Sequence, residues 1–285
     1  MMVRILNRVT TLTFTLCLFS LSASAAEKVL YVTHEPGRYH KYTPQLATFK
    51  NVIAKKAGWE VTVMTGDYDG VIAQLRKPNF AKGFDVIVYN YCFAGSEDLD
   101  ACANVIKQTR ELGVPALLIH CSMHSWWQSY KSGVKGAIGN GYQGEAKATP
   151  EMVGKWRKDH GSEPFPAYGD FTGVASHRHG PKLPIILHKV GKHPATKDLK
   201  EGYATPKTEL YNNAYVLDGV VPIIEGVQGK AKAIVMWTCP QGKSRVMGLT
   251  LGHGAVGDGP DEWETPEFQG LVTNGVNYLI KHPKP

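Results

Sequence analysis

Three histidines stand at the ends of apolar segments that are typical of buried strands. His40 follows the first such run, His120 ends the run at 114–120, and His253 follows the run at 245–250. Imidazole acts as a general acid or base near neutral pH, or as a metal ligand. A histidine is more often a structural residue, but repeated placement at strand ends favours a shared chemical role for these three if they converge.

Apolar segments alternate with amphipathic helical segments over the first half of the chain. This alternation predicts an α/β fold with a parallel sheet and right-handed crossovers. Ligands of such sheets bind outside the carboxyl ends of the strands, where the three histidines are expected. The expected strands are 28–33, 59–64, 84–89, 114–120, 171–175, 185–187, 215–221, 233–237 and 245–250, and the expected helices are 43–57, 99–112, 150–158 and 265–281.

The segment 126–184 interrupts this alternation. It is rich in Gly, Pro, Lys and aromatic residues and contains one expected helix. A long insertion of this kind inside a compact domain is usually a lid or a wall of a site. Because the sequence has no internal repeat and no linker, we expect one domain over 26–285 with this insertion in its middle.

The first 25 residues are typical of an export signal. Arg4 and Arg8 precede a short uncharged apolar run, and residues 23–25 (Ala-Ser-Ala) form a small-x-small cleavage site. The run is shorter than the roughly 20 residues that a membrane helix needs, and no later segment is apolar enough. We therefore expect a periplasmic or secreted chain of about 260 residues without a membrane span.

The net charge of +7 comes from 32 basic residues interspersed with 25 acidic ones, without a long basic run. This pattern indicates no nucleic-acid partner and is compatible with a small anionic or neutral substrate. The oligomeric state stays open, and a homo-oligomer is compatible with the sequence.

Six short motifs follow one another over nearly the whole mature chain. They are GRYHKY (37–42), LLIHCSMHSWW (117–127), HPATKDL (193–199), ELY (209–211), MWT (236–238) and RVMGLTLGHG (245–254). In this order they resemble the ThuA-like, or trehalose-utilisation, family. The resemblance implies a flavodoxin-like three-layer α/β/α sandwich similar to class I glutamine amidotransferases, with a mostly parallel sheet. It also implies a role in carbohydrate metabolism, including trehalose and 3-keto sugar pathways, and hence a small-molecule carbohydrate substrate.

By this resemblance, His40, His120, Glu209 and His253 fall on motif positions of the family. His120 or His253 would then be a general base or metal ligand, Glu209 would orient or ligate, and His40 would bind substrate or metal. A divalent metal such as Zn²⁺ would need these atoms at about 2.0–2.2 Å from one point. The same residues could instead act without a metal as acid, base and sugar binders. The reaction class is open between lyase, isomerase and hydrolase, and a sugar-binding module without turnover is the alternative.

Aromatic and basic residues near these positions are candidates for binding the substrate. Two tryptophans follow the strand that ends at His120, and such rings can stack on the C–H faces of sugars, although they are also common core residues. An arginine and a tyrosine precede His40, where they could hold a hydroxyl or carboxylate or merely cap a helix. Two more histidines lie in the insertion, close to the substrate or in a solvated loop. These candidates are Arg38, Tyr39, Trp126, Trp127, His177 and His179.

Cys121 raises the question of a cysteine nucleophile, because amidotransferases of this fold carry one on a sharp strand-to-helix turn. Such a turn needs small neighbours, whereas Ile119 and Met123 flank this position. We therefore expect a buried or disulfide-bonded thiol, with a cysteine hydrolase as the third alternative. After loss of the signal, three pairings are open to the four remaining cysteines, which are Cys92, Cys102, Cys121 and Cys239.

The sequence departs from the family pattern at two places. Cys121 and Ser122 replace small apolar residues after His120, and the segment 176–181 matches the family poorly, so the substrate stays open.

His193, which precedes a proline, is expected to anchor a turn. The acidic residues after His253 are expected to form a solvated loop, and they are Asp258, Asp261, Glu262 and Glu264.

Overall fold

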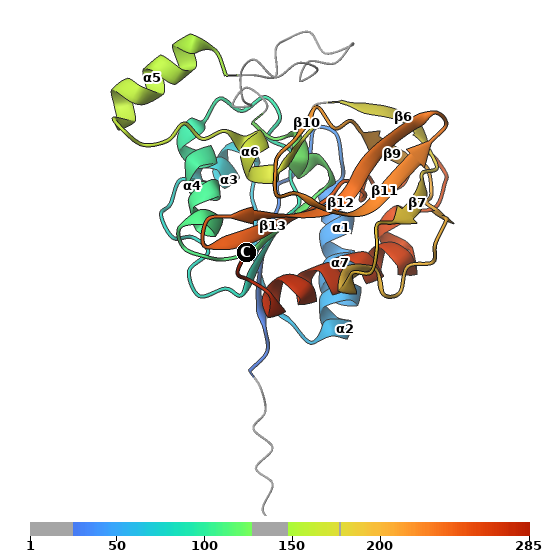
Figure 1. The fold of residues 1–285 in the computed structure, drawn as a ribbon. Coiled ribbons are helices and arrows are strands. Elements are labelled where there is room, and N and C mark those ends of the chain that lie inside the picture. Colours follow the sequence, from blue (N-terminus) through green and yellow to red (C-terminus); the bar gives the residue numbers. More distant parts are fainter. Residues whose placement is uncertain (1–24, 127–147, 177) are drawn as a thin grey trace, which may run out of the picture.

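The computed structural model describes residues 25–126, 148–176 and 178–285 (Figure 1). All but the last residue of the predicted signal peptide lies outside this part of the chain. So do Trp127 and His177, two of the candidate substrate-binding residues. Among the described residues, no helix is both long and apolar enough to cross a membrane.

A nine-stranded mixed sheet forms the middle layer of the fold. Its strands in spatial order are β2 (Glu60–Met64), β1 (Lys28–Val32), β3 (Val86–Tyr89), β4 (Ala116–Ile119), β13 (Ser244–Leu249), β12 (Ala231–Gln241), β11 (Val221–Gln228), β7 (Ile186–Lys189) and β8 (Tyr203–Ala204). Neighbouring strands from β2 to β13 run parallel. Those from β13 to β8 run antiparallel. The predicted parallel core with alternating strands and helices is therefore confirmed.

Helices cover both faces of the sheet and make the fold a three-layer α/β/α sandwich (Figure 1). Side chains of a strand point to alternate faces, so Val29 and Tyr31 pack on one side and Leu30 and Val32 on the other. One layer contains α1 (Tyr42–Thr48), the π-helical turn at 49–54, α2 (Lys55–Ala57) and α7 (Pro266–Lys281); the other contains α3 (Tyr68–Leu75), α4 (Leu99–Arg110) and α6 (Tyr168–Thr172).

Capping side chains explain where several helices begin. The Asp98 carboxylate accepts a hydrogen bond from the Ala101 N–H at the start of α4. Thr265 does the same for Phe268 at the start of α7, where Pro266 occupies the first turn. Asp67 caps α3 through the Gly70 N–H, and this helix was not expected from the sequence.

The insertion contributes α5 (Pro150–His160), α6 and one strand of a short β-ribbon. The expected strand at 171–175 is wrong over its first half, because α6 runs to Thr172 and only β5 (Val174–Ala175) is extended. The expected strand at 215–221 is interrupted by a turn at Gly219, whose φ of 87° suits glycine, between β10 (Tyr215–Val216) and β11. The β-ribbon pairs β6 (His179–Leu183) with β9 (Thr208–Tyr211).

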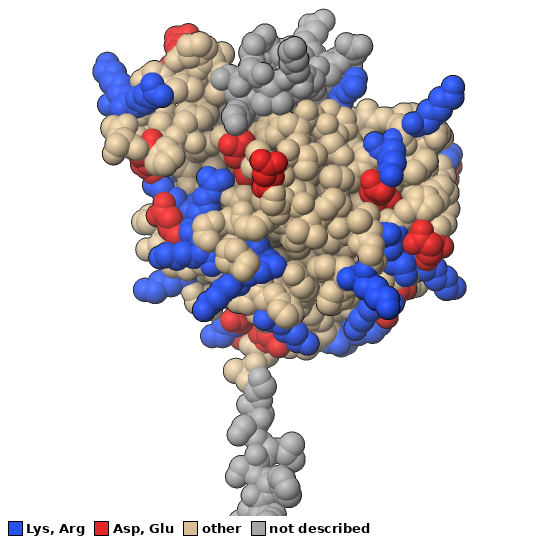
Figure 2. All heavy atoms as spheres, in the orientation of Figure 1, with Lys and Arg blue, Asp and Glu red and all other residues tan. Residues whose placement is uncertain are grey.

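The charged side chains on the face in Figure 2 are mixed in sign. Lys and Arg are spread over several elements, with Asp and Glu among them. This distribution agrees with the absence of a long basic run in the sequence.

Candidate active site

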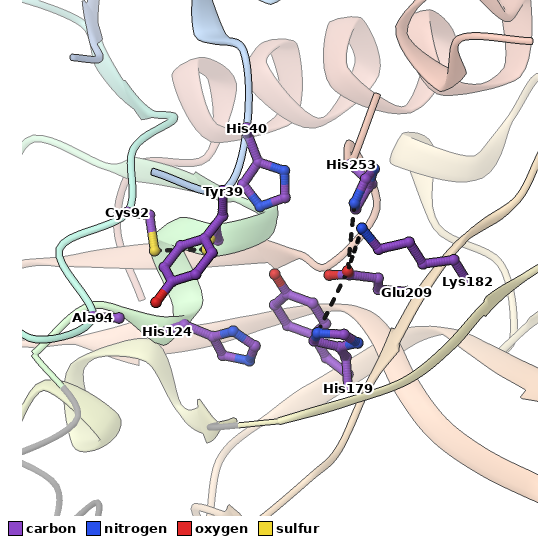
Figure 3. Close-up of a pocket in the computed structure, with 11 residues that line it drawn as sticks. Tyr39, His40, Cys92, Ala94, His124, His179, Lys182, Glu209 and His253 are labelled. Carbon is purple, nitrogen blue, oxygen red and sulfur yellow. Dashed lines mark hydrogen bonds and ion pairs between the residues drawn. The ribbon is translucent and has the colours of Figure 1, made fainter. Parts of the chain in front are cut away.

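The buried carboxylate of Glu209 is the centre of a polar cluster (Figure 3). Its Oε1 atom lies 3.4 Å from Nε2 of His179, 3.4 Å from Nε2 of His253 and 3.5 Å from Nζ of Lys182. Its Oε2 atom lies 3.5 Å from Nε2 of His120. Four basic side chains from three segments thus surround one carboxylate that is only 4% exposed.

Strand pairing explains how these segments meet. Ile119 of β4 is opposite Leu249 of β13, so His120 and Thr250 leave the sheet side by side. In the β-ribbon, Lys182 of β6 is opposite Glu209 of β9. The predicted convergence at the carboxyl edge of the parallel strands is what the geometry shows.

His120 occupies the sharp turn at the end of β4. Its φ of 46° lies in the left-handed region, which costs a non-glycine residue on the order of 1–3 kcal/mol and is common at functional sites. Its Nδ1 lies 2.6 Å from the carbonyl oxygen of Thr250. A carbonyl only accepts, so Nδ1 carries a hydrogen and donates it to this oxygen, while Nε2 faces Glu209.

His179 is oriented in the same way. Its Nδ1 lies 2.7 Å from the carbonyl oxygen of Gly180, and its Nε2 faces Glu209. An imidazole beside a negative charge is a ready proton acceptor, because the carboxylate stabilises the imidazolium that forms. The cluster is therefore suited to proton transfer.

His40 packs edge-on against two other rings of the cluster. Its ring centroid lies 4.7 Å from that of His120 and 4.9 Å from that of His253. Burial, together with the charges of these two histidines, lowers the pKa of His40 from 6.5 to about 2. His40 is therefore neutral at physiological pH and can donate or accept a hydrogen bond without carrying charge.

The protonation states of Glu209 and His120 follow from their surroundings. Burial acts to raise the pKa of Glu209, but the contacts with His120 and His253 and the charge of His179 hold it well below its usual value. Burial lowers the pKa of His120. At neutral pH the centre is thus an ionised carboxylate among imidazoles, with the Lys182 ammonium 3.5 Å from Oε1.

Glu262 lies beneath the site, and the expectation of a solvated acidic loop is wrong for this residue. It is 1% exposed, and its Oε2 accepts hydrogen bonds from the N–H groups of Gly252 and His253 and from the Thr208 hydroxyl. Burial raises the pKa of Glu262 to about 7. The neighbouring Asp258 and Glu264 are exposed, as expected for that loop.

A cavity of about 200 Å³, partly open to solvent, lies over the cluster. This volume is below the range of about 300–1,000 Å³ that sites for drug-sized ligands occupy. The cavity is lined by Tyr39, His40, Cys92, Ala94, Cys121, His124, His179, Lys182, Glu209, Tyr211 and His253. His120 is absent from this lining and only 1% exposed, so it supports Glu209 from behind.

The candidate substrate-binding residues divide between the cavity and the rest of the fold. Tyr39 lines the cavity and is 51% exposed, and the Arg38 guanidinium lies over its ring at 5.3 Å rather than in the lining. Trp126 is fully buried, packs on Phe93 and Tyr168, and does not line the cavity. Trp126 is therefore placed in the core and not in the expected sugar-binding wall.

Sequence reasoning did not identify Lys182 as a site residue. It lies beside the candidate segment 176–181, but a lysine in a Gly- and Pro-rich insertion is usually solvated. Only the pairing of β6 with β9 reveals its place opposite Glu209. By contrast, His193 accepts a hydrogen bond from the Ala195 N–H at 3.1 Å, which confirms its expected role in a turn.

The metal expectation was tested on the arrangement of the four predicted ligands. His40, His120, Glu209 and His253 do come together. However, over the part of the chain that the structure describes, no three or more His, Cys, Asp or Glu side chains are placed so that they could hold a metal ion. The arrangement does not fit a metal, and the chemistry below uses the side chains alone.

Cys121 has the properties of a buried thiol. All four cysteines of the described chain are buried, and none of them is in a disulfide bond. Burial and the neighbouring Cys92 raise the pKa of Cys121 well above its usual value, whereas a nucleophilic cysteine needs a lowered pKa. The expectation that Cys121 is not an activated nucleophile agrees with this environment.

Comparison with solved structures identifies the fold. A ThuA-like protein from Parabacteroides merdae superposes with a TM-score of 0.61 at 15% identity, over 90% of both chains. A ThuA-like protein from Bacteroides uniformis has a TM-score of 0.55 at 16% identity, over 90% of this chain and 93% of the other. No family model and no curated protein matches the sequence. The chain thus shares the fold of ThuA-like proteins.

Proposed function

We propose that the chain is an exported ThuA-like enzyme that transfers protons on a small carbohydrate, an oxidised (keto) sugar or its glycoside. The observation that carries the proposal is the Glu209 carboxylate in the wall of a cavity, with the Nε2 atoms of His179 and His253 each 3.4 Å from Oε1. The order of the sequence motifs, the shared fold and the predicted signal peptide support the rest.

His253 is the proposed general base. It lines the cavity, and neither ring nitrogen has a hydrogen-bond partner among the described residues. When Nε2 takes a proton from the substrate, the adjacent Glu209 carboxylate stabilises the imidazolium. His179, which reaches in from β6, is placed to return a proton at the same carboxylate.

Lys182 is the proposed stabiliser of negative charge on the substrate. Removal of a proton next to a carbonyl group moves an electron pair onto the carbonyl oxygen, and a nearby ammonium group lowers the energy of that oxyanion. Neutral His40 can donate a hydrogen bond to the same region. These roles favour an isomerase or a lyase, because both reactions begin with proton abstraction beside a carbonyl.

His120 is a positioning residue in this scheme rather than a catalytic one. Its Nδ1–H is fixed by Thr250, and its Nε2 contacts the Glu209 oxygen that faces away from His179 and His253. It therefore sets the orientation of the carboxylate that the other two histidines use.

Deuterium exchange tests the proposal without knowledge of the final product. The protein is incubated in D₂O with 3-keto-glucose or 3-keto-trehalose, and the C–H signals next to the carbonyl are followed by NMR. We expect their loss to be catalysed by the wild type and by His188→Gln, a control at an exposed position of β7, but not by His253→Gln. Binding shifts without exchange would overturn the enzyme proposal in favour of a sugar-binding module.

A further inference from the structure

Two cysteines face each other in the wall of the candidate active site. Tyr89 of β3 is paired in register with Leu118 of β4, and Cys92 and Cys121 each lie three residues beyond these positions. Their Sγ atoms are 2.7 Å apart, as the dashed line from Cys92 in Figure 3 shows. Adjacent parallel strands therefore bring the two thiols together where both chains leave the sheet.

Both thiols can be reached from the cavity although they are buried. Each residue is 5% exposed, and both belong to the lining of the cavity. The other two cysteines lie elsewhere: the Cys102 thiol faces the carbonyl oxygen of Pro166, and the Cys239 thiol faces that of Pro240. Neither of these lines the cavity. The active-site pair is thus distinguished by position from the remaining cysteines of the described chain.

We propose that Cys92 and Cys121 form a reversible disulfide in the wall of the active site, made by exchange with a small disulfide oxidant. The sulfur of one cysteine attacks the oxidant, forming a mixed disulfide and releasing one thiol. The second cysteine then attacks that mixed disulfide, which forms the Cys92–Cys121 bond and releases the second thiol. The two thiol protons of the protein pass to the two leaving groups, so the protein is oxidised by two electrons and the oxidant is reduced.

The burial of the two thiols and the closeness of their sulfur atoms favour a small disulfide as the oxidant. Burial raises the pKa of Cys121, so little thiolate is present there and general alkylating reagents react slowly. The proximity of the two sulfurs favours ring closure once either one carries a mixed disulfide. The bond would tie together the ends of β3 and β4, which form one wall of the cavity opposite Glu209 (Figure 3).

The experiment uses the full chain, reduced and then freed of reductant. It is equilibrated with bis(2-hydroxyethyl) disulfide over a range of thiol-to-disulfide ratios, denatured in N-ethylmaleimide and measured by intact mass and peptide mapping. We expect the oxidised protein to carry two fewer maleimide groups than the reduced protein, with a Cys92–Cys121 cross-linked peptide. Dithiothreitol should restore both groups.

Three variants show which thiols are responsible. Cys102→Ser should still lose two maleimide groups on oxidation, because its thiol lies outside the cavity. Cys92→Ser and Cys121→Ser should each lose the cross-linked peptide and stop at a mixed disulfide or a free thiol. The proposal would be overturned if both Cys92 and Cys121 of the wild type carried maleimide at every thiol-to-disulfide ratio. A cross-link between other cysteines would also overturn it. This outcome is independent of whether the protein turns over a sugar.

Discussion

The Glu262 carboxylate holds the backbone of His253, with 3.1 Å between Oε2 and the amide nitrogen. The same oxygen accepts a hydrogen bond from the Thr208 hydroxyl at 2.9 Å. Because Thr208 directly precedes Glu209, one buried carboxylate connects the segments that carry both members of the Glu209–His253 contact. The separation of these two site residues therefore depends on a third residue that does not reach the cavity.

Replacement of Glu262 by Ala should destabilise the protein and impair the site together. The change leaves the buried donors of Gly252, His253 and Thr208 without their acceptor, at about 1–3 kcal/mol for each group that finds no new partner. Urea unfolding measures the loss of stability, and deuterium exchange measures the loss of proton transfer. Glu264→Ala is the matched control, since Glu264 is exposed, and it should change stability by less than about 0.5 kcal/mol. Equal stability of the two variants would contradict the role of Glu262.

Glu209→Gln should reduce deuterium exchange by about 100-fold or more while the chain stays folded. The amide keeps the shape of the side chain but cannot stabilise an imidazolium on His179 or His253, and acid–base groups contribute about 10²–10⁴ in rate. The rate is compared at saturating keto sugar, with circular dichroism as the check on folding. Exchange at the wild-type rate would show that the carboxylate has no part in the chemistry.

The free energy of unfolding should fall as the pH is lowered below 6.5. Protonation of His40 in the unfolded chain should account for part of this pH dependence. The unfolded chain protonates His40 near its ordinary pKa of 6.5, whereas the folded chain keeps it neutral down to a pKa of about 2. The unfolded state therefore binds one more proton in this window, which removes about 1.4 kcal/mol of stability per pH unit. Urea unfolding at pH 7, 6 and 5 should give a shallower dependence for His40→Asn. Parallel curves for the two proteins would show that His40 titrates normally in the folded state.

The parallel half of the sheet could be predicted from the sequence because its strands are short apolar runs bounded by turns and helices. The segment 221–228 was missed, since Pro222 and Gly226 are unusual inside a strand. The structure explains Gly226 by close packing: a Cβ there would lie 2.5 Å from a methyl group of Val235 and 2.7 Å from one of Ile185. Such tertiary constraints leave no periodic signal in the local sequence.

The site was predictable to the extent that its residues end strands. His40, His120 and His253 follow from that placement, and Glu209 follows from the motif resemblance. Glu262 could not be found this way, because it lies in an acidic stretch that is typical of a solvated loop and only folding buries it. The positions of His120 behind the Glu209 carboxylate and of His253 on its cavity side also depend on three-dimensional packing.

Alanine substitution of Trp126 should affect mainly stability and that of Tyr39 mainly substrate binding. The Trp126 ring is in the core, whereas the Tyr39 ring is at the cavity mouth. The Trp126 ring packs on Phe93 and Tyr168, and its Nε1–H donates to the Asp98 carbonyl oxygen at 3.0 Å. Trp126→Ala should therefore cost about 3–5 kcal/mol of unfolding free energy. Tyr39→Ala, at an exposed position, should cost less than about 0.5 kcal/mol but raise the keto-sugar concentration needed for half-maximal exchange. If Trp126→Ala were as stable as the wild type but bound the sugar more weakly, Trp126 would be a substrate-binding residue, as expected from the sequence.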